Sequence, residues 1–301
     1  MNKGLKWPIE ASNTENGSSY QWSHSGSNLC LDFHGSPLKS KLVVFSDGNH
    51  HMALEASCQE FLKRYPDVVD VFYATTPPAV LVQTLIKGSL MLGNLHLDIK
   101  PHVFISPKNI LDNLQSKNFV SSHKSFARSR GNVLLVRKNN PKNILKVSDM
   151  YRDDVRLVIS NPESEKASYE VYRETLINFA KKESIDEAST EKLLRNEEST
   201  IYSQVIHHRE VPQAIFSGRA DVALVYYHLA LRYTRIFPDD FDYILLDELE
   251  SSEGAEISNI TTDYHIGVVG DGGDWGNKFY EFMSSDDALS IYEKHGLVAP
   301  I

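Results

Sequence analysis

The chain has 301 residues, of which 41% are hydrophobic and 24% are charged, and its formal net charge is −9. This length suits about two domains, and the hydrophobic fraction is sufficient for a sizeable buried core. The acidic balance argues against a nucleic-acid-binding surface, which needs a concentrated basic face. No apolar run is long enough to cross a bilayer, so we expect a soluble chain without membrane insertion.

The segment 1–38 is polar and reads as an extended arm. It is rich in Ser, Asn and Gly and contains no apolar stretch of the kind that marks a secretory signal. The sequence as written predicts a cytoplasmic location, whereas a chain whose leader has been removed would be periplasmic. The two cysteines, Cys30 and Cys58, leave open a disulfide or two free thiols, and a reducing compartment favours the thiols.

From residue 41 the hydrophobic pattern alternates between short buried strands and amphipathic helices. Strands are expected at residues 42–45, 68–74 and 102–106, and helices at 52–65, 80–88 and after Pro107. Thr75 and Thr76, followed by two prolines, are typical of a capped helix start. Alternation of this kind indicates an α/β fold with parallel strands joined by right-handed crossovers.

The second half of the chain repeats this alternation after a polar link. Strands are expected within 126–137 and at 155–160, 222–226, 241–247 and 264–269, and helices at 161–182, 201–217, 227–234 and twice in 277–300. A glycine turn at Gly218 precedes the strand at 222–226, and the charged segment 183–200 is expected to be a solvated helix or loop. The pattern predicts a first lobe of residues 39–125 plus 246–301 and a second lobe of residues 126–245.

Polar residues follow the predicted strands of the first lobe. In parallel sheets, ligands bind at the carboxyl ends of strands, near the N-termini of helices. Ser46, Thr75 and Thr76 fall at such ends, and their hydroxyl groups together with helix amides could bind a tetrahedral dianion. The alternative is that the two threonines only cap the following helix.

Six segments, taken in order, resemble the type II periplasmic binding proteins of the molybdate-binding kind. They are LVVFSDGNHHMALEASCQEFLKRYPDVVDVFYATTPPAVLVQTLIKG, HVFISPKNILDNL, FARSRGNVLLVRKNNPKNI, VRLVISNPESEKASYEVYRETL, FSGRADVALVYYHLAL and KFYEFMSSDDALSIYEKHGLVAP. The resemblance covers roughly residues 40–300. It implies a two-lobed α/β fold in which each lobe is a mixed, mainly parallel sheet flanked by helices, and in which hinge closure traps a ligand in the manner of a Venus flytrap.

Carried over position by position, the resemblance also implies a set of ligand contacts. These are Ser46 and the loop Asp47, Gly48, Asn49 and His50, then Thr75 and Thr76, the backbone amides near Ser168 and Val222, and the side chains of Tyr226 and Tyr227. Three features depart from the family: Ala167-Ser168 replaces a glycine, the loop after Ser46 is longer and more polar, and Tyr227-His228 replaces small residues.

The resemblance implies a solute-binding protein and not an enzyme, with no cofactor, a monomeric state and a small inorganic oxyanion such as molybdate, tungstate or sulfate as ligand. An ABC permease would be its partner if the chain is exported. Two alternatives stay open. One is a ferric or other metal binder that uses His50, Tyr226 and Tyr227, as ferric-binding proteins of the same superfamily do, although the carboxylate expected after the third strand is missing. The other is a cytoplasmic sensor of a small organic anion.

Overall fold

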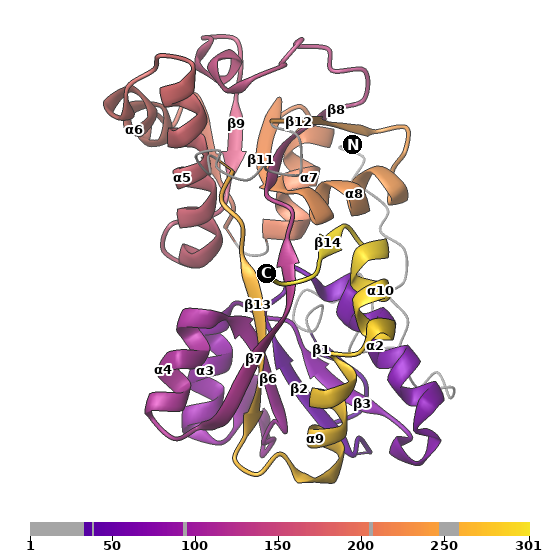
Figure 1. The fold of residues 1–301 in the computed structure, drawn as a ribbon. Coiled ribbons are helices and arrows are strands. Elements are labelled where there is room, and N and C mark those ends of the chain that lie inside the picture. The colour runs from indigo at the N-terminus through magenta and orange to yellow at the C-terminus, as the bar shows by residue number, and fades with distance from the viewer. Residues whose placement is uncertain (1–32, 38, 93–94, 205–206, 247–258) are drawn as a thin grey trace. The chain divides into compact units, whose positions relative to one another are not determined.

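The computed structural model describes residues 33–37, 39–92, 95–204, 207–246 and 259–301 (Figure 1). The chain forms two compact units, here called the terminal unit (residues 33–128 and 263–301) and the central unit (residues 129–262). The chain passes between them after Arg128 and after Thr262, whereas the sequence places these crossings at residues 126 and 246. Most of the predicted arm lies outside the described residues.

The terminal unit is built on a seven-stranded mixed sheet with the strand order β1-β3-β2-β6-β13-β7-β14. Its strands are β1 (Phe33–His34), β2 (Leu42–Ser46), β3 (Val71–Ala74), β6 (Val103–Pro107), β7 (Val120–Ser129), β13 (Asp263–Val269) and β14 (Leu297–Val298). β2 lies between β3 and β6 and is parallel to both, whereas β13 is antiparallel to β6 and β7. A separate antiparallel pair is formed by β4 (Leu90–Leu92) and β5 (Leu95–Leu97).

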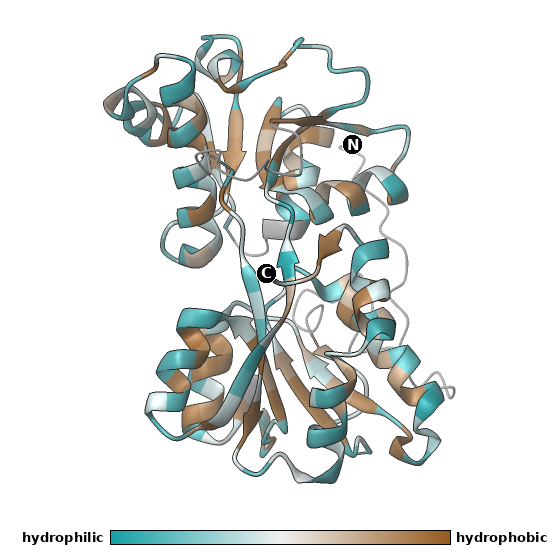
Figure 2. Cartoon of the chain, in the orientation of Figure 1, coloured by the Kyte–Doolittle hydropathy of each residue, from teal (hydrophilic) through white to brown (hydrophobic). Residues whose placement is uncertain are grey.

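Helices cover both faces of this sheet. They are α2 (His51–Arg64), α3 (Pro78–Lys87), α4 (Lys108–Ser116), α9 (Gly273–Phe282) and α10 (Asp286–Lys294), with a 3₁₀ turn, η1, at Pro66–Val68. Because strand side chains alternate between faces, Val44 packs in one cluster with α2, α9 and α10, and Phe45 packs in the other with α3 and α4. Brown strands mark these apolar layers in Figure 2.

The central unit has a five-stranded sheet with the order β10-β9-β11-β8-β12. Its elements are β8 (Asn132–Arg137), η2 (Val147–Tyr151), β9 (Leu157–Ile159), α5 (Lys166–Lys182), α6 (Glu187–Arg195), β10 (Thr200–Tyr202), α7 (His207–Phe216), β11 (Val222–Tyr226), α8 (Tyr227–Ile236) and β12 (Phe241–Leu245). β9 is parallel to β10 and β11, and β8 is antiparallel to β11 and β12. Both units are therefore mixed sheets flanked by helices, as predicted.

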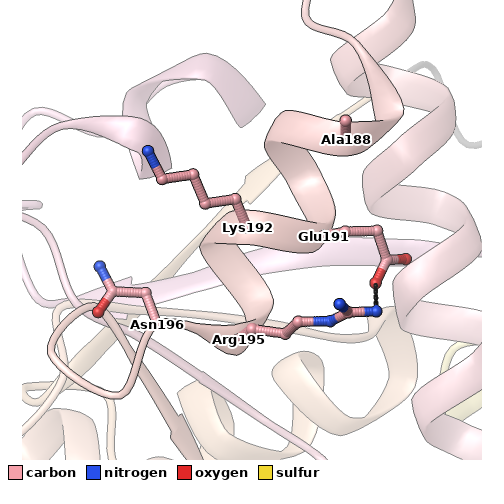
Figure 3. A pocket seen from close by; sticks show the side chains of 5 residues that line it. All are labelled: Ala188, Glu191, Lys192, Arg195 and Asn196. Carbon is pink, nitrogen blue, oxygen red and sulfur yellow. Dashed lines mark ion pairs between the residues drawn. The ribbon is translucent and has the colours of Figure 1, made fainter.

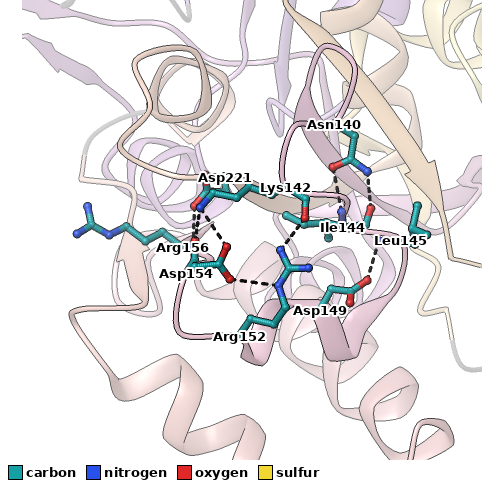
Figure 4. Close-up of polar contacts among 9 residues, drawn as sticks. All are labelled: Asn140, Lys142, Ile144, Leu145, Asp149, Arg152, Asp154, Arg156 and Asp221. Atoms are coloured by element: carbon teal, nitrogen blue, oxygen red, sulfur yellow. Dashed lines mark hydrogen bonds and ion pairs between the residues drawn. The ribbon is translucent and has the colours of Figure 1, made fainter.

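Side chains fasten the long connection between β8 and β9 to the backbone (Figure 4). The amide of Asn140 exchanges two hydrogen bonds with the backbone of Ile144, and the Asp149 carboxylate accepts from the N–H groups of the two residues that precede η2. Asp221 accepts from the backbone N–H of Arg156 (2.9 Å). This last bond joins the amino ends of β9 and β11.

Most predicted elements are confirmed, and the differences have local causes. The strand predicted at 68–74 starts only at Val71, because Val68 ends η1 and Val69 follows with φ +67°. α5 begins at Lys166 and not at Asn161, because the Asn161 side chain accepts from the N–H groups of the following residues and forms a turn. Within the described residues, no helix is long and apolar enough to span a membrane.

Candidate functional site

The parallel strands of the terminal unit bring three polar residues to one edge of the sheet. Phe45 of β2 is in register with Ala74 of β3 and with Phe104 of β6. β2 and β6 continue this register, since Ser46 pairs with Ile105, whereas β3 ends at Ala74 and Thr76 follows two residues after that last pair. The Asp47 backbone N–H donates to the Ile105 carbonyl oxygen (3.2 Å), so β2 and β6 stay paired to this point. We call Thr76, Asp47 and Ser106 the strand-end row.

The side chains of the strand-end row are buried but lack hydrogen-bond partners. Thr76 is 8% exposed, Asp47 2% and Ser106 0%. Among the described residues, neither hydroxyl group and neither Asp47 oxygen makes a hydrogen bond. Since the great majority of buried polar groups are paired, and an unpaired one costs about 1–3 kcal/mol, the row has the character of a binding site for a polar ligand.

The buried ring of His50 contacts Asp47 of the strand-end row. Its Nε2 atom lies 3.3 Å from Asp47 Oδ1 and 3.2 Å from Ser46 Oγ, and its Nδ1 atom lies 2.8 Å from the Tyr292 hydroxyl group. The ring is fully buried beside the rings of Tyr264 and Tyr292. Ser46 donates to the Asp47 carbonyl oxygen (3.0 Å). Ser46 and His50, predicted as ligand contacts, therefore use their polar groups within the unit and position Asp47.

This cluster is neither a nucleophilic triad nor a ready metal site. In a triad the carboxylate and the nucleophile face different ring nitrogens, whereas Ser46 and Asp47 both face Nε2 of His50. A metal ion would have to displace one of these contacts. Across the part of the chain that the structure describes, no group of three or more His, Cys, Asp or Glu residues is placed to hold a metal ion.

The helix after β3 starts at a proline and not at a threonine. Pro77 is the N-cap residue of α3, and no side chain makes a capping hydrogen bond there. The capping interpretation is therefore wrong for Thr76, whose hydroxyl group makes no hydrogen bond among the described residues. In the loop after β2, Gly48 and Asn49 are half-buried, and the Gly48 carbonyl oxygen lies 2.8 Å from Nδ1 of His51.

The central unit gathers its own polar groups at the carboxyl ends of β9 and β10. Ser160 Oγ donates to Ser168 Oγ (3.2 Å), and Ser168 Oγ donates to the carbonyl oxygen of Glu165 (3.1 Å). Ser203 follows β10 and contacts the Glu165 carboxylate. Ser168 lies in the first turn of α5, where backbone N–H groups have no partner within the helix. Its position is that of the predicted amide donor.

Tyr226 and Tyr227 stand at the carboxyl end of β11, as predicted, but in different environments. Tyr226 is buried, stacks on His228 with centroids 5.2 Å apart, and its hydroxyl group lies 3.0 Å from Thr262 Oγ1. Tyr227 opens α8 and is half-buried, with the Arg130 guanidinium 5.3 Å from its ring centroid. The two phenol rings therefore do not share one set of contacts.

Val222 is not placed as an amide donor to a ligand. It begins β11, at the end of the strand opposite Tyr226, and its backbone N–H donates to the Arg156 carbonyl oxygen (3.2 Å). The neighbouring Asp221 is tied to the same Arg156 backbone (Figure 4). The Val222 amide itself is thus already paired, whereas the prediction concerned the amides near Val222.

A surface depression of about 600 Å³ lies on α6 (Figure 3). Its lining residues are Ala188, Glu191, Lys192, Arg195 and Asn196. The backbone N–H of Thr200, the first residue of β10, donates to the Asn196 carbonyl oxygen, so the depression adjoins the amino end of that strand. Arg195 is 82% exposed. This open position is unlike that of the buried strand-end row.

Ser106 and Tyr292 were missed as site residues. Ser106 carries a signal, because it ends the third strand directly before Pro107 and the sequence already places that loop at the carboxyl edge. Tyr292 carries none, because it reaches His50 across 242 residues of sequence.

The match to a family of known proteins covers most of the chain. Residues 42–298 match the family described as bacterial extracellular solute-binding protein. The chain belongs to this solute-binding protein family. No curated protein sequence matches it. The family description is one of binding and not of catalysis, and it supports the predicted family resemblance without singling out the molybdate-binding kind.

Solved structures share the fold of this solute-binding protein at low sequence identity. The periplasmic molybdate-binding protein of Azotobacter vinelandii is 15% identical, with a TM-score of 0.61, over 87% of this chain and 100% of that one. The sulfate-binding protein SubI of Mycobacterium tuberculosis is 15% identical, with a TM-score of 0.63, over 85% of each chain. Iron-bound HitA of Pseudomonas aeruginosa is 12% identical, with a TM-score of 0.57, over 84% of this chain and 83% of that one. This likeness establishes the α/β fold and leaves the ligand open.

Proposed function

We propose that this solute-binding protein takes a small tetrahedral oxyanion at the strand-end row of its terminal unit. One observation carries the proposal: the hydroxyl groups of Thr76 and Ser106 are buried, lack hydrogen-bond partners among the described residues, and belong to the carboxyl ends of the two strands that pair with β2. Such a pair of unsatisfied donors is costly unless a ligand accepts from both.

Hydroxyl groups suit an anion because they donate hydrogen bonds without adding a fixed charge. α4 begins at Lys108, two positions after Ser106, so the positive end of its helix dipole lies at the same edge. Hydrogen bonds to a charged group contribute about 1.5–3 kcal/mol each. Two such bonds with support from the helix end are a reasonable basis for measurable affinity.

The proposal favours an oxyanion over a ferric ion. Two of the structural neighbours are described as binding molybdate and sulfate, and one as iron-bound. In this chain both ring nitrogens of His50 already have partners, and the Tyr226 hydroxyl group lies against Thr262. The two hydroxyl groups of the strand-end row that lack hydrogen-bond partners belong to Thr76 and Ser106. They are alcohols, which are weak iron ligands compared with carboxylate or phenolate oxygens.

The cellular role is part of the proposal. A form of the chain that carries a leader would deliver its ligand to an ABC permease. A form without one would buffer or sense the same ligand in the cytoplasm.

A thermal-shift panel tests the proposed function. Molybdate, tungstate, sulfate, phosphate and arsenate are each added to the purified chain, and a ligand at about 100 times its Kd should add about 2.7 kcal/mol of stability. Thr76→Val and Ser106→Ala should each weaken binding by about tenfold or more, because each removes one hydrogen bond to the anion. The ligand-free Thr76→Val variant should be no less stable than the parent, since the lost hydroxyl group has no partner.

Ser57→Ala is the matched control. Ser57 is also buried and lacks a hydrogen-bond partner among the described residues, but it lies within α2 and not at a strand end. Its substitution should leave ligand affinity unchanged. The absence of any stabilising oxyanion, or equal losses in all three variants, would refute the proposed function.

A further inference from the structure

Two histidines of the terminal unit face each other outside the strand-end row. His123 lies on β7 and His265 on the neighbouring strand β13. Their Nδ1 atoms are 3.0 Å apart, and their ring centroids are 5.1 Å apart. The His123 side chain and His265 are each 8% exposed. The two ring nitrogens are therefore held together in a largely buried place.

Asp112 on α4 determines where His123 carries its hydrogen. The Oδ1 atom of Asp112 lies 3.1 Å from His123 Nε2, and its Oδ2 atom accepts from Lys108 Nζ (2.8 Å). An ionised carboxylate only accepts hydrogen bonds, so Nε2 of His123 is the donor. A neutral His123 ring therefore has its lone pair on Nδ1, the atom that faces His265.

The spacing of the two Nδ1 atoms suits a single metal ion. Imidazole nitrogens bind Zn²⁺ at about 2.0–2.1 Å. Two of them on one ion are then about 2.9 Å apart at neighbouring corners of a square and about 3.3 Å apart in a tetrahedron. The observed 3.0 Å lies between these values. Imidazole suits Zn²⁺, Cu²⁺ and Ni²⁺, whereas Mg²⁺ and Ca²⁺ prefer oxygen ligands.

Two further contacts fit a bound ion. Histidines that bind metals almost always donate their other ring N–H to a carboxylate, a carbonyl group or water, and His123 faces Asp112 in this way. Ser125 of β7 pairs with His265, and its hydroxyl oxygen is buried without a hydrogen-bond partner among the described residues. Side chains of directly opposed residues share a face of the sheet. A water molecule on the ion would donate to this hydroxyl oxygen.

We propose that His123 and His265 bind one divalent transition-metal ion, Zn²⁺, Cu²⁺ or Ni²⁺, through their Nδ1 atoms, with water in the remaining positions. Binding requires the hydrogen of His265 to reside on Nε2, so that both Nδ1 atoms present lone pairs and neither neutral ring loses a proton. Asp112 stays bonded to His123, so the chain supplies two ligands, in keeping with the absence of a three-residue metal group among the described residues. The site does not depend on the proposed oxyanion function.

Isothermal titration calorimetry of the chain without a histidine tag tests the site with Zn²⁺ and Ni²⁺ at about pH 7.5, where ordinary imidazole is neutral. His123→Gln and His265→Gln should each weaken binding at least ~100-fold, because one imidazole cannot chelate the ion. Asp112→Ala should weaken it about 10–100-fold, because His123 loses its supporting acceptor. His96→Gln, which alters an exposed histidine of β5, should leave the affinity unchanged, and Mg²⁺ should not compete.

Electron paramagnetic resonance of the parent with one equivalent of Cu²⁺ needs no variant, so a misfolded histidine variant would not block the test. Pulsed spectra should count two imidazole rings at the ion, and a count of one or none would overturn the proposal. If the two rings share only a hydrogen bond, folded His123→Gln and His265→Gln variants will bind Zn²⁺ and Ni²⁺ as tightly or as weakly as the parent, which would also overturn it. Either result leaves the oxyanion site standing, because Thr76→Val and Ser106→Ala test that site separately.

Discussion

The side-chain amide of Asn259 pairs with the backbone of Asn132 as a neighbouring strand would. The Asn132 N–H donates to Asn259 Oδ1 (2.6 Å), and Asn259 Nδ2 donates to the Asn132 carbonyl oxygen (2.9 Å). Thr175 on α5 accepts from the Asn132 side chain (2.8 Å) and from the Ile260 N–H (3.2 Å). The two segments that enter and leave the central unit are thus tied to each other and to α5.

Removal of this amide should destabilise the central unit. Asn259→Ala leaves the backbone N–H of Asn132, a fully buried residue, without its partner, and an unsatisfied buried group costs about 1–3 kcal/mol. Urea unfolding measures the loss. Asn277→Ala is the control, because Asn277 also donates to backbone carbonyl groups but is exposed, and its loss should cost less than Asn259→Ala. Equal losses would contradict the role of the pair.

Gly131 allows Asn259 to approach the chain. Its φ is +86°, and a Cβ atom there would lie 2.6 Å from Cγ and Oδ1 of Asn259. Gly131→Ala should therefore be more destabilising than Gly218→Ala, which has φ +72° but no atom within 4 Å of the added methyl group. Gly218→Ala therefore measures only the cost of placing a Cβ atom on a left-handed backbone, which is about 1–2 kcal/mol. Thermal or urea unfolding of the two variants gives the comparison, and equal values would show that the close approach does not matter.

The stability of the terminal unit should depend on neutral histidines. His102 Nδ1 accepts from the Val43 N–H (3.0 Å), and burial lowers the pKa of His102. Burial, and next the neighbouring His123, lower the pKa of His265. A pKa below the ordinary value of 6.5 means that the unfolded chain binds the proton more readily. The free energy of unfolding should therefore hold above about pH 6.5 and fall as the pH drops through the folded-state pKa values.

Urea unfolding across this pH range checks the dependence. His102→Gln removes one of the two titrating groups, so its free energy of unfolding should fall less steeply with decreasing pH than that of the parent. Identical slopes would show that His102 does not titrate with folding.

Cys58 should be inert in the folded protein. Its side chain is fully buried in α2, and burial, followed by the charges of Glu55 and Asp70, raises the pKa of the thiol. Since the thiolate is the reactive form, a Cys30→Ser variant should react with a thiol reagent only after urea is added. The variant isolates Cys58, because the chain has two cysteines and Cys30 has been replaced. Labelling of the native variant at the rate of an exposed cysteine would contradict the burial of Cys58.

Local sequence patterns were enough to predict much of the fold. The strand Val222–Tyr226 and the helix start at Lys108 agree with the structure because short apolar runs and a proline mark them. The same alternation predicted parallel strands, which is why Ser46 and Thr76 were placed at carboxyl ends of strands, and β2 is indeed parallel to β3 and β6.

The remaining features depend on contacts between distant segments. The hydroxyl group of Ser46 was predicted to face a ligand, but it is used by His50, whose position depends on Tyr292. Backbone amides near Val222 were predicted as donors to a ligand, and the amide of Val222 itself is bonded to Arg156. A sequence shows which groups can donate, and only the packed structure shows which of them are already paired.

The most direct test of the strand-end row is a crystal structure of the chain with the oxyanion that stabilises it most. We predict that the anion lies with oxygen atoms at hydrogen-bonding distance, about 2.6–3.2 Å, from Thr76 Oγ1 and Ser106 Oγ. Electron density for the anion at another place, with both hydroxyl groups still unpaired or bonded only to water, would contradict the proposed site.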